Sequence, residues 1–318
     1  MHELAERYRL FARTEAAGRS PLYERLSIHV SQSPAALALL STLPPDKRQP
    51  NLFFAALRRV ADTPLSIDAF EKSLAEHAAA IRQVMLSRST QTNEPGRCSV
   101  LLPSLASITG DVALIEVGAS AGLCLLFEEY GFDWGARRLL PRQGAAARPI
   151  FPCKVTGTAP LPIEYPNIVW RAGLDLNPVD LRNDDDVAWL ELLVWPEDAD
   201  RLERLQAAIR IARSKPPRVV RGNLLRDLKG LMAQAPAEAT VVVYHSAVLS
   251  YIADQDSRDE FAETMLAANC VWISNESPRV FPQFARDLEP APDGMFLLTV
   301  NGRPQAWTSP HGRELHWI

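Results

Sequence analysis

The sequence has few of the residues and patterns on which several large classes of protein depend. Its 318 residues include only four cysteines, and none of them stands at metal-ligand spacing or suggests a disulfide framework. No apolar run reaches the roughly 20 residues that span a membrane. The N-terminus lacks the basic and then apolar pattern of a signal peptide. We therefore expect a cytoplasmic protein with no metal site and no membrane attachment.

Positive charge is also sparse and scattered. The net charge is −4 and the sequence pI is about 5.9. Proteins that bind duplex nucleic acid usually carry a basic stripe, and no cluster of lysine and arginine forms one here. We therefore expect a small-molecule or protein substrate and no nucleic acid. The sequence leaves the oligomeric state open.

The length favours two folding units, because a single hydrophobic core rarely grows through 318 residues. Residues 1–109 have the three- and four-residue apolar spacing of helices. The clearest case runs from Ser66 to Leu86 and places one set of side chains on one face: Ile67, Phe70, Leu74, Ala78, Ile81 and Met85. No strand is expected before residue 112. Residues 1–109 are thus predicted to form an all-α N-terminal cap.

The pattern changes over residues 110–318, where short apolar runs alternate with helical stretches. The runs typical of buried strands are residues 112–117, 168–170, 218–221, 240–244 and 270–274. Such alternation predicts an α/β domain with a Rossmann-like, mostly parallel sheet covered on both faces. Residues 295–300 and 314–318 are predicted as strands of an antiparallel C-terminal edge, joined by a loop that contains glycine and proline. Residues 132–166, rich in proline, glycine and arginine, are expected to form an excursion with little regular structure.

A glycine-rich turn follows the first predicted strand. It reads Glu116-Val117-Gly118-Ala119-Ser120-Ala121-Gly122, and we expect a helix from Leu123 to Tyr130 after it. Small residues let the backbone approach a ligand, and a helix N-terminus supplies free N–H groups. Glu116, Gly118, Ser120 and Gly122 are therefore candidate cofactor-binding residues. The turn has no lysine, so a triphosphate is not expected.

The same turn allows two other interpretations. Gly118-x-Ser120-x-Gly122 also matches the nucleophile elbow of a serine hydrolase, with acids and histidines following in a permitted order. The helical first third disfavours this interpretation, because several strands normally precede such an elbow. The turn is also compatible with a plain connection between a strand and a helix.

Two further strand ends carry polar residues. Asp175 follows the second predicted strand, where an acid can accept hydrogen bonds from both ribose hydroxyls. Asn223 follows the third, where it is suited to an adenine amino group. Each residue is equally suited to capping a helix or turn.

With these three signals in order, residues 110–318 resemble class I S-adenosylmethionine-dependent methyltransferases. The matching stretches are 116–122, 173–178, 222–225, 240–251 and the terminal strands. The resemblance implies S-adenosylmethionine as cofactor and a methyl acceptor that the sequence does not name. Ser120 and Asn223 replace the usual glycine and aspartate, which favours a third hypothesis: a non-catalytic protein that binds a nucleotide-type ligand.

Catalytic residues are expected at the ends of the fourth and fifth predicted strands. The sulfonium of S-adenosylmethionine carries its own leaving group, so the protein mainly aligns the methyl group and its acceptor. Tyr244 and His245 end the fourth strand, and His245 is a candidate general base and also a candidate cofactor-binding residue. Glu276 ends the fifth strand and is a candidate for orienting the substrate. A histidine packed against a helix is the structural alternative.

The whole chain resembles more closely a bacterial family, domain of unknown function 2332. The stretches that carry this resemblance are Ser20–Tyr23, Gln49–Leu52, Gln91–Glu94, Glu116–Leu123, Leu193–Pro196 and Pro310–Arg313. It implies no known reaction. It favours a lid function for the polar link Gln91–Arg97, whose composition also fits a solvated turn.

Overall fold

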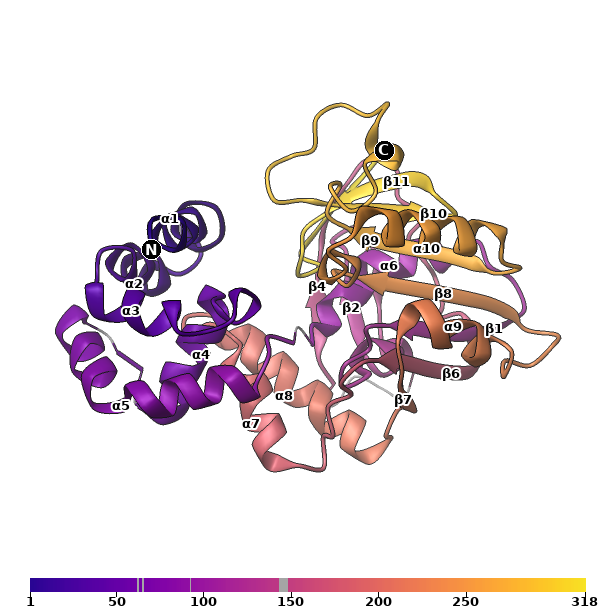
Figure 1. Cartoon of the computed structure of the whole chain (residues 1–318). Helices are drawn as coiled ribbons and strands as arrows, with labels where there is room; N and C mark the ends of the chain where they lie inside the picture. Colours follow the sequence, from indigo (N-terminus) through magenta and orange to yellow (C-terminus); the bar gives the residue numbers. More distant parts are fainter. Residues whose placement is uncertain (62, 65, 92, 143–147) are drawn as a thin grey trace. The chain divides into compact units, whose positions relative to one another are not determined.

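The chain divides into two compact units, drawn in Figure 1. The computed structural model describes residues 1–61, 63–64, 66–91, 93–142 and 148–318. The first unit comprises Met1–Thr92 and Asp184–Leu202, and the second comprises Asn93–Asn183 and Glu203–Ile318. The division differs from the boundary expected at residue 109, because the second unit begins at Asn93 and the first unit takes in a later segment.

The first unit is built from helices, as the apolar spacing predicts. They are α1 (His2–Phe11) with a π-helical continuation (Ala12–Ala16), α2 (Pro21–Val30), α3 (Pro34–Ser41), α4 (Pro50–Val60), α5 (Ile67–Ser87) and α7 (Asp184–Leu192), with a 3-10 turn at Pro45–Lys47. Ser20, Ser33 and Ser66 each accept a hydrogen bond from a backbone N–H of the helix that follows. Such caps satisfy N–H groups that the first helical turn leaves free.

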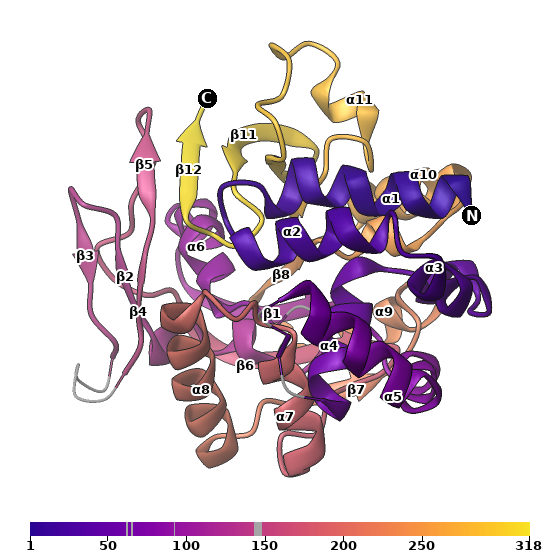
Figure 2. The same ribbon diagram turned by 90° about the vertical axis from the view of Figure 1, so that its left-hand side faces the viewer.

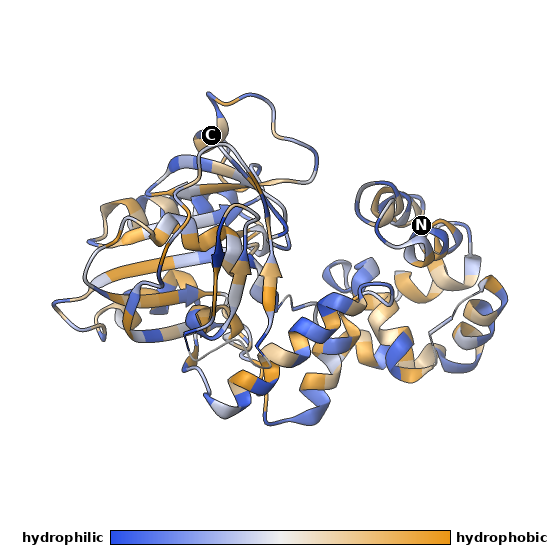
Figure 3. Ribbon diagram, turned by 180° about the vertical axis from the view of Figure 1, so that it is seen from behind, coloured by the Kyte–Doolittle hydropathy of each residue, from blue (hydrophilic) through white to orange (hydrophobic). Residues whose placement is uncertain are grey.

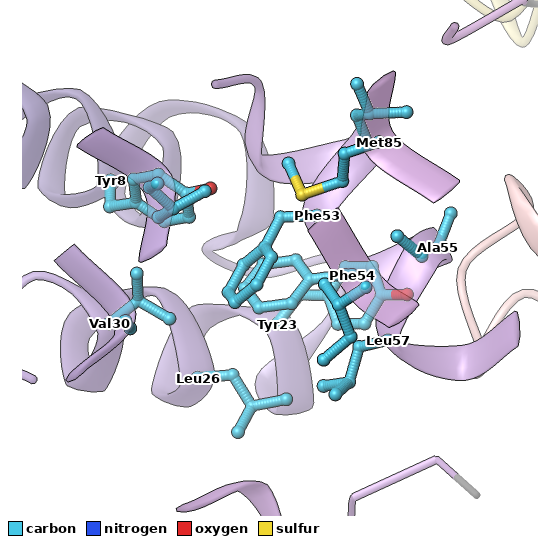
Figure 4. Close-up of a cluster of buried hydrophobic side chains, with 14 of the residues drawn as sticks. Tyr8, Tyr23, Leu26, Val30, Phe53, Phe54, Ala55, Leu57 and Met85 are labelled. Atoms are coloured by element: carbon cyan, nitrogen blue, oxygen red, sulfur yellow. The ribbon is translucent and has the colours of Figure 1, made fainter. Parts of the chain in front are cut away.

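Aromatic side chains fill the core of this unit. Tyr8, Phe53 and Phe54 are almost completely buried, and the rings of Tyr23 and Phe54 lie 4.6 Å apart (Figure 4). Hydrophobic and hydrophilic residues alternate along most of these helices (Figure 3). This amphipathic pattern is what the three- and four-residue spacing requires.

The stretch Leu193–Pro196 is fixed to the helices around it. The indole of Trp195 packs against Tyr23, with ring centres 5.6 Å apart, and its N–H donates to Asn51 Oδ1 at 2.9 Å. Arg58 donates to the Val194 carbonyl at 2.7 Å. Three of the stretches that carry the family resemblance therefore meet inside the first unit as structural contacts.

Glu197 holds the start of α2, and its loss is expected to destabilise the first unit. Its carboxylate accepts from Ser20 Oγ at 2.8 Å and from the Leu22 N–H at 2.9 Å. Glu197→Ala should lower the free energy of unfolding by about 1.5–3 kcal/mol, the range for hydrogen bonds to a charged group. Urea denaturation measures this. Glu76→Ala on α5 removes an exposed glutamate and should change little; an equal loss in both variants would contradict the assignment.

The second unit contains a nine-stranded sheet in the order β5-β12-β11-β10-β9-β8-β1-β6-β7. The strands are β1 (Asp111–Val117), β5 (Lys154–Thr156), β6 (Asn167–Asp175), β7 (Val219–Arg221), β8 (Thr240–Ser246), β9 (Val271–Glu276), β10 (Phe296–Val300), β11 (Arg303–Thr308) and β12 (Glu314–Trp317). The strands from β7 to β9 pair in parallel, and β9 to β12 pair antiparallel. The sheet is therefore mostly parallel with an antiparallel edge, as predicted.

Helices cover one face of the sheet, and the segment around Phe127 packs on the other. Apolar residues of α9 (Leu224–Met232) and α10 (Gln255–Ala267) pack with Trp272, Val243 and Ile115 on one face. On the other face, the rings of Phe127 and Tyr244 lie 5.7 Å apart. The remaining helices of the chain are α6 (Cys98–Leu105), α8 (Ala199–Ser214) and α11 (Pro282–Ala285). No helix among the described residues is long and apolar enough to cross a membrane.

Two expectations about the segments 132–166 and 300–314 are wrong. The excursion at 132–166 is more regular than expected: β2 (Gly131–Asp133), β3 (Arg138–Leu139) and β4 (Ile150–Pro152) form a small sheet, and β5 pairs with β12 (Figure 2). The loop expected between residues 300 and 314 contains β11. Its sequence is polar and includes Pro304, which pairs where the register of β10 shifts. A proline is tolerated at such an irregularity, which hides the strand from sequence analysis.

Candidate functional site

The strand order of the second unit reverses at β1. The chain passes from β1 to β6 and β7 on one side, and then returns to β8 and β9 on the other side. In open α/β sheets a crevice forms at such a reversal, outside the carboxyl ends of the strands, and ligands bind there. The residues after β1, β6 and β8 are therefore the candidate site.

The turn after β1 needs glycine at Gly118. This residue has φ +72°, and a side chain there would collide with Val248 in the loop after β8. Ser120 also has a left-handed backbone, with φ 51°, which is uncommon for a residue with a side chain. Such conformations cluster at functional sites, because the surrounding structure must hold them in place.

Every backbone N–H of the turn has a partner within the second unit. The N–H groups of Gly118 and Ala119 donate to the Leu174 carbonyl, and that of Gly122 donates to the Ala119 carbonyl at 2.7 Å. The Ser120 N–H donates to Asp175 Oδ2 at 2.8 Å. The turn thus offers a ligand no free backbone donor in this conformation.

The helix expected at Leu123–Tyr130 does not form, and this prediction is corrected. Two short 3-10 turns, Leu123–Leu125 and Phe127–Glu129, take its place. The five residues 123–127 are all buried. An α-helix would turn some of them to solvent, so the irregular path buries more apolar surface. The turn therefore has no helix N-terminus to attract an anion.

Asn93 braces the turn from a distant part of the sequence. Its Nδ2 donates to Ser120 Oγ at 2.8 Å, and its Oδ1 accepts from the Ala121 N–H at 2.9 Å. Asn93 was not among the candidate site residues, although its polar segment was noted as a lid. The neighbouring Thr92 lies outside the described residues. Asn93 joins the segment 93–97 to the site.

Arg97 joins two more loops to the same place. It is buried, and its guanidinium donates to the carbonyl of Ser246, the last residue of β8, at 2.8 Å and to the Pro310 carbonyl at 2.9 Å. Ser99 Oγ lies 2.7 Å from the Gly96 carbonyl and 2.6 Å from the Gly312 carbonyl. Residues 93–97 are thereby held to residues 310–313, and the family resemblance includes 310–313 and, within the first segment, Asn93 and Glu94.

Asp175 and Asn223 are engaged within the protein. Asp175 Oδ1 accepts from the Asn177 N–H at 2.7 Å, so the carboxylate fixes its own turn as well as the glycine turn. Asn223 Oδ1 accepts from the Leu225 N–H at 2.8 Å and caps α9. Asp175 therefore lies at the glycine-rich turn. Asn223 caps a helix, which was the alternative to its role as a cofactor-binding residue.

Glu116 and Tyr244 are neighbours on one face of the sheet. They are paired in register on β1 and β8, and both side chains are buried. Burial raises the pKa of Glu116 well above its usual range, and Cys124 adds to the shift, against the opposing effects of Tyr244 and Arg97. Burial likewise raises the pKa of Tyr244. Among the described residues, neither Glu116 Oε2 nor Tyr244 Oη makes a hydrogen bond of good geometry, although they lie close together.

His245 lies on the opposite face, because side chains alternate along β8. It is completely buried, with Nδ1 2.7 Å from Glu276 Oε1 and Nε2 3.0 Å from Trp272 Nε1. An indole N–H can only donate, so Nε2 accepts and Nδ1 carries the proton that Glu276 accepts. The structure thus brings His245 and Glu276 together, occupies both ring nitrogens, and separates them from Tyr244.

Glu276 also shapes the loop after β8. Its Oε1 accepts from the backbone N–H groups of Val248 and Leu249, at 2.9 and 3.2 Å. Ala247, which precedes Val248, has φ 58° and is a second left-handed residue with a side chain. This loop reaches the glycine turn through Val248. Glu276 is therefore a positioning residue for the site.

No cluster of histidine, cysteine, aspartate or glutamate in the described residues is arranged to hold a metal ion.

Comparisons with known proteins give a family and no function. No curated protein and no solved structure matches the chain. A family model does match, over residues 5–317. The chain therefore belongs to the family described as "Uncharacterized protein conserved in bacteria (DUF2332)".

Proposed function

We propose that the second unit binds S-adenosylmethionine at the carboxyl edge of its sheet and transfers the methyl group to a small molecule or a protein. The strand order carries this proposal. The central parallel strands lie in the order β7-β6-β1-β8-β9. If these five strands are numbered as they follow along the chain from β1, their order across the sheet is 3-2-1-4-5. This is the order of a Rossmann-type sheet, whose ligand crevice opens beside the first strand.

The ligand would be recognised by carboxylates, because the N–H groups of the turn are already engaged. Each oxygen of Asp175 accepts one bond within the protein. A carboxylate has about four acceptor positions, so Asp175 retains capacity for ribose hydroxyls. The buried carboxyl of Glu116 would lose its proton and pair with the ammonium group of the amino-acid end. Gly118 and Gly122 instead let Val248 and Pro217 pack directly against the turn.

His245 does not act as the base in this proposal, because both of its nitrogens are engaged. With Glu276 it instead positions the loop after β8. Methyl transfer needs alignment of acceptor and sulfonium and exclusion of water, to which a firmly held loop contributes. Tyr244, on the other face, would orient Glu116.

Calorimetric titration with S-adenosylmethionine and S-adenosylhomocysteine tests the cofactor. We expect saturable binding by the full-length protein, with proton release seen as a dependence of the heat on buffer ionisation enthalpy. Glu116→Gln should weaken binding about tenfold or more, as loss of a charged hydrogen bond implies. The control Glu238→Gln, before β8, should bind normally. Absence of heat at high ligand concentration would remove the proposal.

One observation favours the serine hydrolase as a second candidate: the left-handed Ser120 in a turn after a strand resembles a strained nucleophile elbow. However, Ser120 is buried and its Oγ receives the Asn93 amide, which is not a base. We expect no labelling of Ser120 by a fluorophosphonate probe. Labelling of the native protein that is lost in Ser120→Ala would establish the hydrolase.

Binding of S-adenosylmethionine without a methylated product from any lysate would favour the non-catalytic hypothesis.

A further inference from the structure

A charged hollow lies in the second unit, away from the carboxyl edge of the sheet. Its volume is about 570 Å³. Its charged lining consists of Glu128, Glu129, Arg142, Arg171, Lys215 and Arg218. Arg171 is four residues before Asp175 on β6, which corresponds to about 13 Å along a strand. The hollow is therefore distinct from the site proposed for S-adenosylmethionine.

The irregular path after β1 creates this hollow. In a regular α/β unit a helix after the first strand packs on this face; here the two 3-10 turns at 123–129 replace it. Arg171 donates to the Leu125 carbonyl at 2.8 Å and to the carboxylate of Glu128 through two nitrogens. In an α-helix the Leu125 carbonyl would accept a hydrogen bond from a backbone N–H, whereas here it accepts one from Arg171. It also fixes one wall of the hollow.

The lining carries an excess of positive charge. Four cationic side chains and two carboxylates line the hollow, a net charge of +2. Glu128 is engaged by Arg171, and Glu129 is engaged by Lys215 at 2.6 Å and by Arg148. Both carboxylates are thus neutralised by neighbours. The excess charge resides on the two remaining arginines.

Arg142 and Arg218 make hydrogen bonds only to neutral oxygens among the described residues. Arg142 donates to the Pro166 carbonyl at 3.3 Å, and Arg218 donates to Gln234 Oε1 at 2.6 Å. Both side chains are exposed, so each guanidinium has donors left for a ligand. Guanidinium groups match the geometry of phosphate oxygens, and a phosphate monoester carries a charge of about −2 at neutral pH.

We propose that this hollow binds the phosphate group of a phosphorylated small molecule through Arg142, Arg218 and Lys215. The phosphate charge balances the net charge of the lining. A volume of about 570 Å³ exceeds what a phosphate alone needs and falls within the range of small-molecule pockets. The apolar side chains of Leu126 and Pro217 would contact the organic part of the ligand.

Calorimetry of the full-length protein with inorganic phosphate, at an ionic strength held constant with chloride, tests the proposal. We expect saturable binding that Arg142→Ala and Arg218→Ala each weaken about tenfold or more. Arg226→Ala, an exposed arginine on α9 on the opposite face of the sheet, is the matched control and should bind as the native protein does. Binding of S-adenosylmethionine should be unchanged in all three variants, which separates this site from the proposed function.

A second measurement does not depend on substitutions. Phosphate should protect Lys215 from acetylation, measured by mass spectrometry, and should leave the exposed Lys229 on α9 unprotected. Equal acetylation of Lys215 in phosphate and in chloride would overturn the proposal. An equal loss of affinity in Arg226→Ala, or tighter binding of malonate than of phosphate, would also overturn it.

Discussion

Replacement of Gly312 by alanine is expected to lower the free energy of unfolding of the second unit by about 4 kcal/mol or more, the range of the most damaging single substitutions. Gly312 has φ +73°, and a Cβ atom there would collide with the Gly96 carbonyl and lie 2.8 Å from the Arg97 nitrogen. These are backbone atoms, which cannot rotate away as a side chain can. Relief requires residues 96–97 and 312 to separate.

That separation would break the contacts that assemble the candidate site. Ser99 Oγ would lose the Gly312 carbonyl, and Arg97 would lose the Pro310 carbonyl. Gly294→Ala is the matched control, because Gly294 has φ +71° and open space around its Cα. It should cost only the left-handed strain, about 1–2 kcal/mol. Urea denaturation of both variants measures the difference, and equal losses would contradict the close approach.

The second large effect is expected in the pH dependence of stability, through Glu116. Burial raises the pKa of this carboxyl well above 4.5, so the folded protein keeps a proton that the unfolded chain releases. Stability from this group is complete below about pH 4.5 and falls as the pH rises towards the folded pKa. The slope is at most about 1.4 kcal/mol per pH unit. Glu116→Gln cannot ionise and lacks this component.

The free energy of unfolding of the native protein minus that of Glu116→Gln should therefore decrease as the pH rises from 4.5 to 8. Glu129→Gln provides a control whose difference should stay constant over this range and should fall only below about pH 4.5. Burial opposes ionisation of Glu129, but Lys215 and Arg148 outweigh it and lower its pKa. Its contribution is present above the unfolded pKa and is lost as the pH falls. A pH-independent difference for Glu116→Gln would show that Glu116 is ionised in the folded protein.

The secondary structure was largely predictable because its signals are local. The apolar run at 112–117 becomes β1, and the spaced apolar residues of 66–86 become α5. Periodicity and helix caps depend on residues within a few positions of one another. The prediction failed at 123–130, where five consecutive buried residues leave no solvent-facing side for a helix. It failed at β11 because that strand is stabilised by its neighbours and has no apolar run of its own.

The candidate site was predicted only in part. The glycine turn and Asp175 were found because strand ends and small residues are visible in the sequence. Asn93 and Arg97 were not predicted as site residues, because each contacts a residue that is distant in the sequence. Asn93 contacts Ser120, 27 positions away, and Arg97 contacts Ser246, 149 positions away. The alternation along β8, which separates Tyr244 from His245, was available from the sequence. The partners of His245 were not, because Trp272 and Glu276 lie on another strand.

The sequence by itself determined the family, the helical and α/β halves, and the strand that precedes the glycine turn. The tertiary structure decided how the polar groups are used. The N–H groups of the glycine-rich turn all make hydrogen bonds within the protein. Glu116 is buried without a well-formed hydrogen bond among the described residues. A cationic hollow lies where a helix was expected. The reason is physical: hydrogen-bond satisfaction and burial depend on side chains brought together from distant positions, whereas helix and strand patterns depend on neighbours in the chain.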